Sequence, residues 1–402
     1  MKIERPYPQL TITDKGFKFL KQNSWVYEDE VIEINGDYQN GDVVDVVSLK
    51  GKYVGSGFIS DKSKVKVRLF SRNASETFND EFFSRRIRYA IDYRKTVMDN
   101  LDNCRLVFGE ADGLPGVTVD KFNDVLVCTI LSFGMERIKK VLYDALLYCL
   151  SEDGEVINAI YERNDNSGRL LEGLEENKGY YWKNPDVTDC VTVIDENGIK
   201  FVVDYENGQK TGYFLDQKFN RLLVRNVARN KKVLDCFTHT GSFALNCAYG
   251  GAISVTAVDI SETAIETAKL NAEINGLSDK VEFVVDDVFD FLDKTSKREY
   301  DMIILDPPAF TKSRSTIQSA YNGYRQINEK AMQILGKGGY LVSCSCSHFM
   351  SQKLYEQMLL EAARNSNVQL KQVSFTQQGK DHPILLNEEQ TNYLKFYIFQ
   401  IV

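Results

Sequence analysis

The sequence predicts an α/β protein in which a doubly wound, mostly parallel sheet follows a small β-barrel and a mixed α+β unit. Three observations support this prediction. From about residue 204 onward, apolar strands alternate with helical segments, which is typical of a parallel sheet covered by helices on both faces. Short strands punctuated by glycines fill residues 1–72. Finally, 402 residues are too many for one ordinary hydrophobic core, so two or three domains are expected.

The first two domains are predicted from short-range patterns. In residues 1–72, apolar and polar residues alternate between glycines, which favours a β-barrel. The following α+β unit is expected to contain a helix over 82–101, strands at 104–108, 117–120 and 124–131, a helix over about 135–150 and a strand at 156–161. A linker over about 163–203 is expected to contain a hairpin. We therefore predict three domains, at 1–72, 73–185 and 186–402.

The third domain carries the alternating pattern. Its predicted strands are 233–236, 254–258, 281–285, 301–305, 339–345, 368–375 and 392–400. Its predicted helices are 242–250, 261–275, 288–294, 317–336 and 351–365. The last two strands are expected to pair as a hairpin at the edge of the sheet.

Composition favours a globular protein without a membrane span. Hydrophobic residues make up 43% and charged residues 26% of the chain, and no apolar run is long enough to cross a bilayer. The first residues lack the apolar core of a signal peptide. Eight scattered cysteines form no disulfide framework, which indicates a reducing compartment. The predicted location is the cytoplasm.

A basic segment stands out in a chain whose net charge is −8. Between Lys62 and Lys95 there are ten basic and four acidic residues, and such local charge is what phosphate binding needs. The alternative is that the charges lie on separate solvated faces. The candidate RNA-binding residues are Lys64, Lys66, Arg68, Arg85, Arg86 and Arg88.

Carboxylates at four successive strand ends predict a site for S-adenosylmethionine (SAM). Asp235 ends the first strand, and Gly241 lets the chain turn into a helix whose N-terminus can meet the methionine carboxylate. Asp259, 24 residues after Asp235, is spaced to receive ribose hydroxyls. Each aspartate could instead cap a helix. The predicted cofactor-binding residues are Asp235, Phe237, Thr240, Gly241, Ser242, Asp259, Ile260, Asp286, Asp287, Val288 and Asp306, together with Lys210 and Tyr213 upstream.

Two other nucleotide sites are disfavoured. The turn after the first strand is not Gly-x-Gly-x-x-Gly, which argues against a nicotinamide dehydrogenase. The chain also lacks Gly-x-x-x-x-Gly-Lys-[Ser/Thr], the phosphate loop of nucleotide hydrolases.

A cysteine at the end of the fifth predicted strand indicates the chemistry. Cys346 closes the strand, whereas Cys344 lies one pleat deeper and is expected to be a buried small hydrophobe. A thiolate that adds to C6 of a pyrimidine makes C5 nucleophilic toward a methyl donor. We expect Asp306 beside Cys346, since neighbouring strand ends are roughly 5 Å apart, where it could bind the cytosine edge. His348 and His382 are candidate acceptors of the C5 proton, or ordinary loop histidines.

Four segments together resemble the bacterial class I 23S rRNA (cytosine-C5) methyltransferases. They are Ala111–Gly116, Lys210–Gln217, Asp306–Phe310 and Ser343–Ser347. The resemblance implies an N-terminal PUA-like RNA-binding domain, a central EEHEE domain and a seven-stranded Rossmann-type methyltransferase domain. It also implies rRNA as the substrate, SAM as the cofactor and Cys346 as the nucleophile that leads to 5-methylcytosine.

Other functions stay open from the sequence. Uracil-C5 methylation would use the same cysteine, and guanine-N2 methylation would share the Asp-Pro-Pro-x-Phe segment without needing it. A non-catalytic RNA-binding assembly factor is the alternative outside enzymes. We expect no metal and no membrane partner, and we consider a homodimer.

Overall fold

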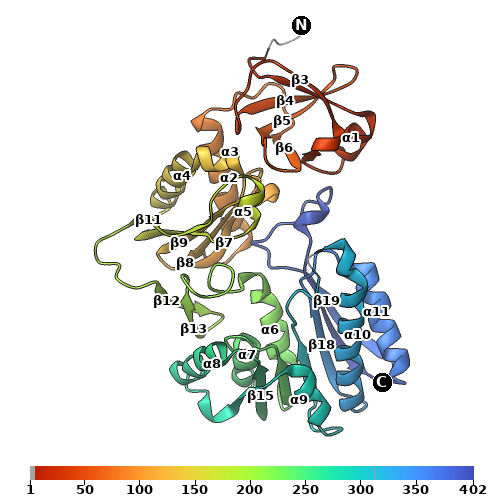
Figure 1. The fold of residues 1–402 in the computed structure, drawn as a ribbon. Coiled ribbons are helices and arrows are strands. Elements are labelled where there is room, and N and C mark those ends of the chain that lie inside the picture. Colours follow the sequence, from red (N-terminus) through yellow and green to blue (C-terminus); the bar gives the residue numbers. More distant parts are fainter. Residues whose placement is uncertain (1–4, 312) are drawn as a thin grey trace. The chain divides into compact units, whose positions relative to one another are not determined.

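The computed structural model describes residues 5–311 and 313–402, and the chain forms two compact units (Figure 1). The first unit comprises Met1–Thr192, Val203–Leu215 and Lys380–Thr391. The second comprises Val193–Val202, Asp216–Gly379 and Asn392–Val402. The predicted boundary after residue 72 lies inside the first unit, and the predicted third domain contributes three segments to it, 186–192, 203–215 and 380–391.

The first unit begins with a six-stranded sheet. Its strand order is β2-β6-β5-β4-β1-β3, with β1 parallel to β4 and the other pairs antiparallel. The strands are β1 (Gln9–Ile12), β2 (Trp25–Tyr27), β3 (Val31–Asn35), β4 (Val43–Ser48), β5 (Tyr53–Ile59) and β6 (Val65–Ser71). Alternate residues such as Leu10, Val46 and Val67 form its core together with α1 (Asp14–Phe19). The predicted β-rich N-terminal region is confirmed.

A five-stranded sheet, β11-β10-β9-β8-β7, forms the rest of the first unit. Its strands are β7 (Asn103–Phe108), β8 (Val117–Phe122), β9 (Val125–Ile130), β10 (Ala159–Asn164) and β11 (Asn177–Lys183). Helix α2 (Asp80–Val97) packs against α4 (Lys139–Glu152). The predicted single helix over 135–150 is wrong in one respect: the chain breaks at Ile138 between α3 (Phe133–Arg137) and α4.

The predicted linker contains more structure than a hairpin. The hairpin is present as β12 (Val191–Glu196) and β13 (Ile199–Asp204), which form their own two-stranded sheet. Before it lie the short helix α5 (Gly168–Leu171) and β11, neither of which the sequence analysis expected.

The second unit is a seven-stranded doubly wound sheet with the order β16-β15-β14-β17-β18-β20-β19. The strands are β14 (Lys232–Cys236), β15 (Ser254–Asp259), β16 (Val281–Val285), β17 (Met302–Leu305), β18 (Tyr340–Ser345), β19 (Leu370–Thr376) and β20 (Lys395–Ile401). All neighbouring pairs are parallel except those that involve β20. The strand order reverses at β14, and ligands bind beyond the carboxyl ends of strands at such a point.

In the part of the chain that the structure describes, six α-helices accompany this sheet. They are α6 (Lys218–Val227), α7 (Ser242–Tyr249), α8 (Glu262–Ile274), α9 (Val288–Lys294), α10 (Ile317–Ile334) and α11 (Gln352–Asn365). Buried residues of α10 and α11 pack in one core with β14, β17 and β18. All but α6 coincide closely with the helices that the sequence predicts.

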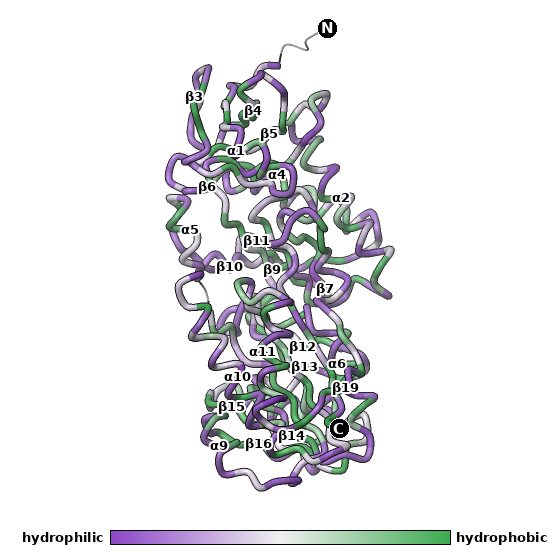
Figure 2. The backbone as a smooth tube through the Cα atoms, turned by 90° about the vertical axis from the view of Figure 1, so that its right-hand side faces the viewer, coloured by the Kyte–Doolittle hydropathy of each residue, from purple (hydrophilic) through white to green (hydrophobic). Residues whose placement is uncertain are grey.

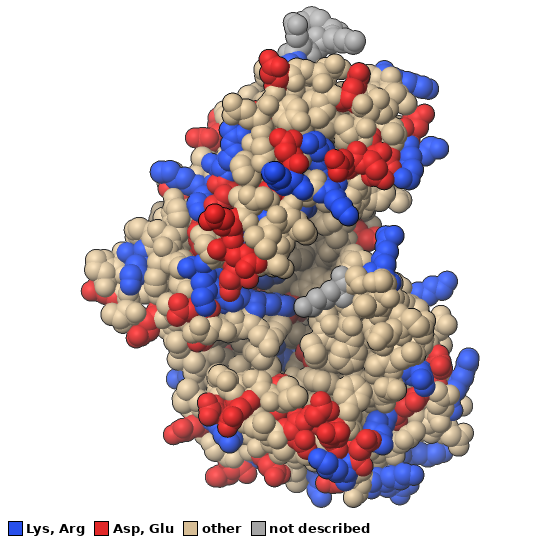
Figure 3. All heavy atoms as spheres, viewed as in Figure 1, with Lys and Arg blue, Asp and Glu red and all other residues tan. Residues whose placement is uncertain are grey.

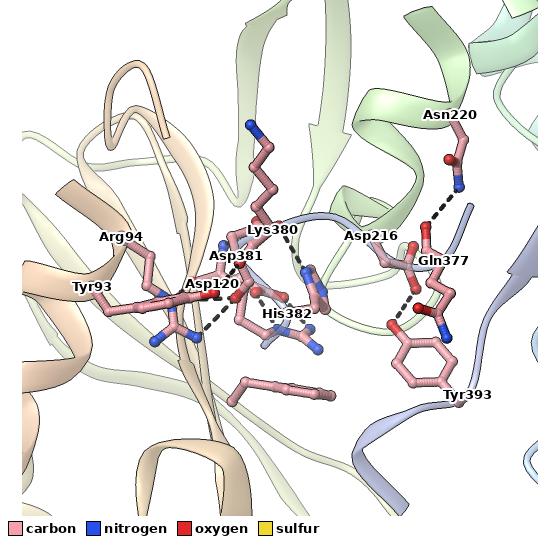
Figure 4. Close-up of polar contacts among 12 residues, drawn as sticks. Tyr93, Arg94, Asp120, Asp216, Asn220, Gln377, Lys380, Asp381, His382 and Tyr393 are labelled. Atoms are coloured by element: carbon pink, nitrogen blue, oxygen red, sulfur yellow. Dashed lines mark hydrogen bonds and ion pairs between the residues drawn. The ribbon is translucent and has the colours of Figure 1, made fainter. Parts of the chain in front are cut away.

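The predicted edge hairpin is confirmed, but its two strands are joined by a long insertion. Strands β19 and β20 pair antiparallel, and Lys380–Thr391 between them belongs to the first unit. There the Asp381 carboxylate accepts from the backbone N–H of Arg105 at 2.9 Å, and its carbonyl accepts from Arg94 Nη2 at 2.8 Å (Figure 4).

Figure 2 shows hydrophilic and hydrophobic residues interspersed along the backbone. Within the described ranges, each helix is too short or too polar to cross a bilayer.

Candidate active site

Asp235 occupies the end of β14 at the switch point of the sheet. Its Oδ2 accepts from Thr238 Oγ1 at 2.6 Å and from the backbone N–H of Ala244 at 3.0 Å. Its Oδ1 is buried and has no hydrogen-bond partner among the described residues. Burial, with a further contribution from the nearby Asp306, raises the pKa of Asp235 to about 7. The unpaired oxygen therefore fits a cationic donor such as the amino group of SAM.

The turn from β14 to α7 has an unusual backbone that fits a ligand at the helix start. Phe237, His239 and Gly241 have φ angles of 61°, 52° and 81°, in the left-handed region. A Cβ on Gly241 would lie only 3.1 Å from Ala268 Cβ, so this position needs glycine. The turn ends at the first residues of α7, whose backbone N–H groups suit an anion.

Asp259, at the end of β15, supports the same turn. Its Oδ2 accepts from the backbone N–H of His239 at 2.8 Å, and its Oδ1 accepts from that of Ser261 at 2.9 Å. Each carboxylate oxygen can accept a second bond, so both can also receive ribose hydroxyls. The next residue, Ile260, is 70% exposed and offers an apolar surface beside the carboxylate.

The two aspartates after β16 differ in their roles. Asp287 caps α9, because its Oδ1 accepts from the backbone N–H of Phe289 at 2.8 Å. Asp286 instead accepts from Lys294 Nζ at 3.1 Å, and its contact with an adenine amino group stays a prediction. Val288 is buried in the core of the sheet.

Asp306, at the end of β17, is oriented by amides that the sequence analysis missed. Gln217 Nε2 donates to both carboxylate oxygens at 3.2 Å. Asn220 Nδ2 donates to Gln217 Oε1 at 2.7 Å. It also donates to the carbonyl of Gln377 at 3.2 Å, the contact that Figure 4 draws. Gln217 lies within the Lys210–Gln217 segment, so that motif contained the signal, whereas Asn220 had none.

Cys346 follows β18 directly and is half-buried. The expectation for Cys344 is confirmed: it is fully buried, and burial raises the pKa of its thiol well above the usual value. The register pairs Leu305 with Ser343, which places Asp306 level with Cys344. Cys346 lies two residues beyond that level, after the last residue of β18, and its position beside Asp306 stays a prediction.

A buried lysine from β20 lies close to Cys346. In the antiparallel pairing of β18 and β20, Lys395 is opposite Ser345. Its Nζ donates to the carbonyls of Ser347 at 2.7 Å and Tyr393 at 2.8 Å. Sequence analysis missed Lys395 because only this long-range pairing brings it to the cysteine.

The two candidate histidines lie in different units. His348 is exposed, two residues after Cys346, and lines a cavity of about 50 Å³ together with Lys395 and Gln377. His382 is buried in the first unit, where its Nδ1 lies 2.9 Å from Asp381 Oδ1 (Figure 4). Its ring centroid is 5.4 Å from that of Phe108.

Lys210 and Tyr213 also lie in the first unit. Lys210 Nζ is 4.4 Å from the centroid of the Phe214 ring, and Tyr213 is buried. Between them, Thr211 Oγ1 donates to Asp120 Oδ2 at 2.5 Å. Their contact with the cofactor stays a prediction.

Most of the candidate RNA-binding residues make ion pairs. The pairs are Lys66 with Asp61, Arg68 with Glu172 and Glu110, Arg85 and Arg86 with Glu76, and Arg88 with Asp153, Glu152 and Asp92. Lys64 is exposed and makes no ion pair with any residue that the structure describes. Figure 3 shows basic and acidic side chains interspersed on one face. The role of these residues in RNA binding stays a prediction.

Comparison with known proteins supports both ends of the chain. Residues 178–396, more than half of the chain, match the model of S-adenosylmethionine-dependent methyltransferases, and residues 11–72 match a PUA-like domain. The chain is 36% identical over 388 residues to "Ribosomal RNA large subunit methyltransferase I" of Serratia proteamaculans and of Escherichia coli O157:H7. Each match covers 95% of this chain and 96% of the relative.

Solved structures show the same fold. The structure of SMU.776 complexed with SAH has a TM-score of 0.82 and 22% identity, over 98% of this chain and 99% of that chain. The structure described as a SAM-dependent methyltransferase from Streptococcus mutans has a TM-score of 0.80, with the same identity and coverage. The strand-end carboxylates, the family model and the relatives agree that SAM is the cofactor. The chain therefore belongs to the SAM-dependent methyltransferases and, among them, to the family of the ribosomal RNA large subunit methyltransferase I proteins.

Proposed function

We propose that the protein methylates C5 of a cytosine in the 23S rRNA of the large ribosomal subunit, with Cys346 as the nucleophile. One observation carries the choice of chemistry: a half-buried cysteine follows β18, on the same sheet edge as the carboxylates of the cofactor site. The names of the relatives supply the class of RNA.

The proposed chemistry begins at the sulfur of Cys346. The thiolate forms a bond to C6 of the base, and the electron pair of the C5–C6 double bond moves to C5. Bound SAM would supply a methyl group that is electrophilic because its carbon is bonded to a sulfonium sulfur, and S-adenosylhomocysteine would be the leaving group. After methyl transfer a base removes the C5 proton, the S–C6 bond breaks, and Cys346 leaves as a thiolate. His348 is our candidate for that base because it lies two residues away.

Asp306 and Gln217 orient the cytosine in this proposal. The carboxylate of Asp306 accepts from the exocyclic amino group N4, which uracil lacks. Gln217 donates to both oxygens of Asp306 and holds its plane fixed. The offset of two residues leaves space between Asp306 and Cys346 for the ring, because the carboxylate binds one edge and the sulfur attacks from a face.

The cofactor is held by residues of the second unit. We assign the buried Oδ1 of Asp235 to the methionine amino group and the start of α7 to its carboxylate. Asp259 receives the ribose hydroxyls. Asp286 and Ile260 contact the adenine, by a hydrogen bond and by apolar contact respectively.

Guanine-N2 methylation is the less favoured alternative because it uses no thiol. The aromatic ring of Asp-Pro-Pro-x-Phe would have to receive the target base. Here the Phe310 ring packs against Tyr324, with centroids 4.6 Å apart. Uracil-C5 methylation uses the same cysteine but offers Asp306 no N4 amino group, and the methylated product distinguishes the two reactions.

Replacement of Cys346 tests the proposal. We expect Cys346→Ala to abolish methyl transfer to 23S rRNA, measured by mass mapping of the modified nucleotide, while SAM affinity measured by titration calorimetry stays within about twofold. Cys190→Ala is the matched control, because Cys190 is also half-buried but lies outside the second unit. RNA with 5-fluorocytidine should trap a covalent adduct with the wild type and not with Cys346→Ala. A base removes the hydrogen on C5 as a proton, but it cannot remove fluorine in this way, so the S–C6 bond does not break.

Two results would contradict the proposal. Full methyl transfer by Cys346→Ala would remove the nucleophile, and a product methylated on uracil or on guanine would remove cytosine. Cytoplasmic location follows from an rRNA substrate and stays a proposal with it. The expected homodimer and the absence of a metal stay predictions.

A further inference from the structure

Lys395 is a buried ammonium group whose hydrogen-bond partners are neutral. The residue is only 5% exposed, and its two hydrogen bonds go to the backbone carbonyls of Ser347 and Tyr393. Among the described residues no carboxylate forms an ion pair with it. Burying a charge without a counter-charge is costly, so a lysine in this position indicates an anion nearby.

The thiol of Cys346 is a group that can become that anion. Cys346 lies between two serines that both contact Lys395. The carbonyl of Ser347 accepts one of the lysine's hydrogen bonds, and Ser345 is the residue opposite Lys395 in the strand pairing. The ammonium carries three N–H groups, and the described residues accept two of them. Lys395 and Cys346 also interact electrostatically.

We infer that Lys395 is a positioning residue that holds Cys346 as a thiolate before RNA binds. This inference rests on the proposed function, because it explains how the proposed nucleophile becomes reactive at neutral pH. The thiol loses its proton to water, and Lys395 keeps its own proton and its charge. A cation beside a cysteine lowers the pKa of the thiol and increases the fraction of thiolate.

The protonation state of Lys395 is consistent with this role. Burial lowers its pKa to about 8, and the interaction with Cys346 opposes that effect. A lysine with this pKa is mostly protonated at pH 7 and loses its charge as the pH rises through 8. Tyr324 on α10 also interacts with Cys346, but burial raises its pKa to about 12, so it is neutral at this pH.

Other groups near the pair complete its electrostatic surroundings. His348 lines the same small cavity as Lys395, and α11 and the segment after β19 contribute the uncharged Gln352 and Gln377 to it. Strand β18 lies between β17, which Asp306 follows, and β20, which carries Lys395, so the carboxylate and the ammonium come from opposite sides of the strand that precedes Cys346. A carboxylate near a cysteine opposes thiolate formation. Lys395 supplies the positive charge that offsets it.

Alkylation of the full-length protein without RNA or SAM tests the inference. The rate at which iodoacetamide modifies Cys346 is measured by mass spectrometry between pH 6 and 10 for the wild type, Lys395→Met, Lys395→Gln and Lys395→Arg. We expect Met and Gln to slow alkylation at pH 7 about tenfold and to leave the rate at pH 10 nearly unchanged, because there the thiolate forms without help. Arg should keep the rate at pH 7 within about threefold.

The controls separate this inference from its alternatives. Alkylation of Cys190 in the same samples reports reagent activity, and SAM binding reports the fold of the second unit. Superimposable pH profiles for the wild type and both neutral variants would overturn the inference, and so would a loss of RNA affinity in Lys395→Met with an unchanged profile, since Lys395 would then bind phosphate. Full methyl transfer by Cys346→Ala would refute the proposed nucleophile while leaving the measured effect of Lys395 on the thiol intact.

Discussion

Asp235 is a single residue whose charge links stability to cofactor binding. Its pKa of about 7 in the folded chain lies above the ordinary value of 3.8 because of burial. Between these two pH values the folded state binds more protons than the unfolded state, so the free energy of unfolding falls as the pH rises from about 4 to 7. The loss in free energy of unfolding is on the order of a few kcal/mol above pH 7. A cation bound beside the ionised carboxylate would reduce this loss.

We therefore predict opposite effects of Asp235→Asn on stability and on binding. Without SAM, the variant should lose less stability than the wild type between pH 5 and 8, measured by urea unfolding at each pH. Its affinity for SAM should fall at least about tenfold in calorimetry, because the amide cannot pair with the amino cation. If the free energy of unfolding changed equally with pH in both proteins, ionisation of Asp235 would not destabilise the folded chain.

Predictions for single residues succeeded where the neighbouring residues in the chain determine the role of the residue. The aspartates at strand ends and Gly241 were predicted because strand, turn and helix follow directly in the chain. Such predictions failed where the contact is between distant segments, as for Lys395, which reaches Cys346 only through the pairing of β20 with β18. The position of Asp306 beside Cys344 also depends on a register that no local pattern specifies.

At the scale of elements, helix α2 is tied to the β19–β20 insertion by a fully buried arginine. Arg94 Nη1 donates to Asp112 Oδ1 at 2.6 Å, and its other nitrogens donate to the carbonyls of Arg105 and Asp381. The side chains of Arg94 and Asp112 are 0% and 7% exposed. This pair therefore differs from the ion pair of Arg137 and Asp42 in the same unit, whose side chains are 43% and 35% exposed.

Replacement of the two arginines should separate these cases. We predict that Arg94→Met lowers the free energy of unfolding of the first unit by about 3 to 5 kcal/mol, because it leaves Asp112 buried without its partner. Arg137→Met should cost less than about 1 kcal/mol, as for other exposed pairs. Thermal unfolding monitored by calorimetry measures both. Similar losses in the two variants would mean that burial does not decide the strength of these pairs.

Elements with a strong period were predictable, and short or irregular ones were not. The strands and most helices of the second unit were predicted from apolar runs that alternate with amphipathic segments. The break at Ile138 was missed because the apolar spacing continues through it. Strand β11 was missed because its residues, Asn177–Lys183, are mostly exposed and contain a glycine, so they lack the alternation of a half-buried strand.

At the scale of the whole molecule, the chain passes repeatedly between its two units. The segments Val203–Leu215 and Lys380–Thr391 belong to the first unit although their neighbours in sequence belong to the second. Boundaries at 72 and 185 divide the chain into contiguous domains, so they exclude segments that return to the first unit. Hydrophobic periodicity carries no information on which distant segments pack together. The Lys210–Gln217 segment, predicted as one motif, is divided between the units after Leu215.

This division allows the cofactor site to be mapped without assuming how the units are arranged. We predict that saturating SAM slows hydrogen exchange at the β14–α7 turn, after β15 and after β16, because a ligand that binds only the folded state stabilises it by about 2.7 kcal/mol at 100 times its dissociation constant. Amides in the core of the six-stranded sheet should exchange at unchanged rates.

The segment Val203–Leu215 tests whether the first unit contributes to the site. Protection there would support the predicted contacts of Lys210 and Tyr213 with the cofactor, and unchanged exchange would assign those residues to the first unit alone. Protection spread evenly over both units would contradict a site confined to the second.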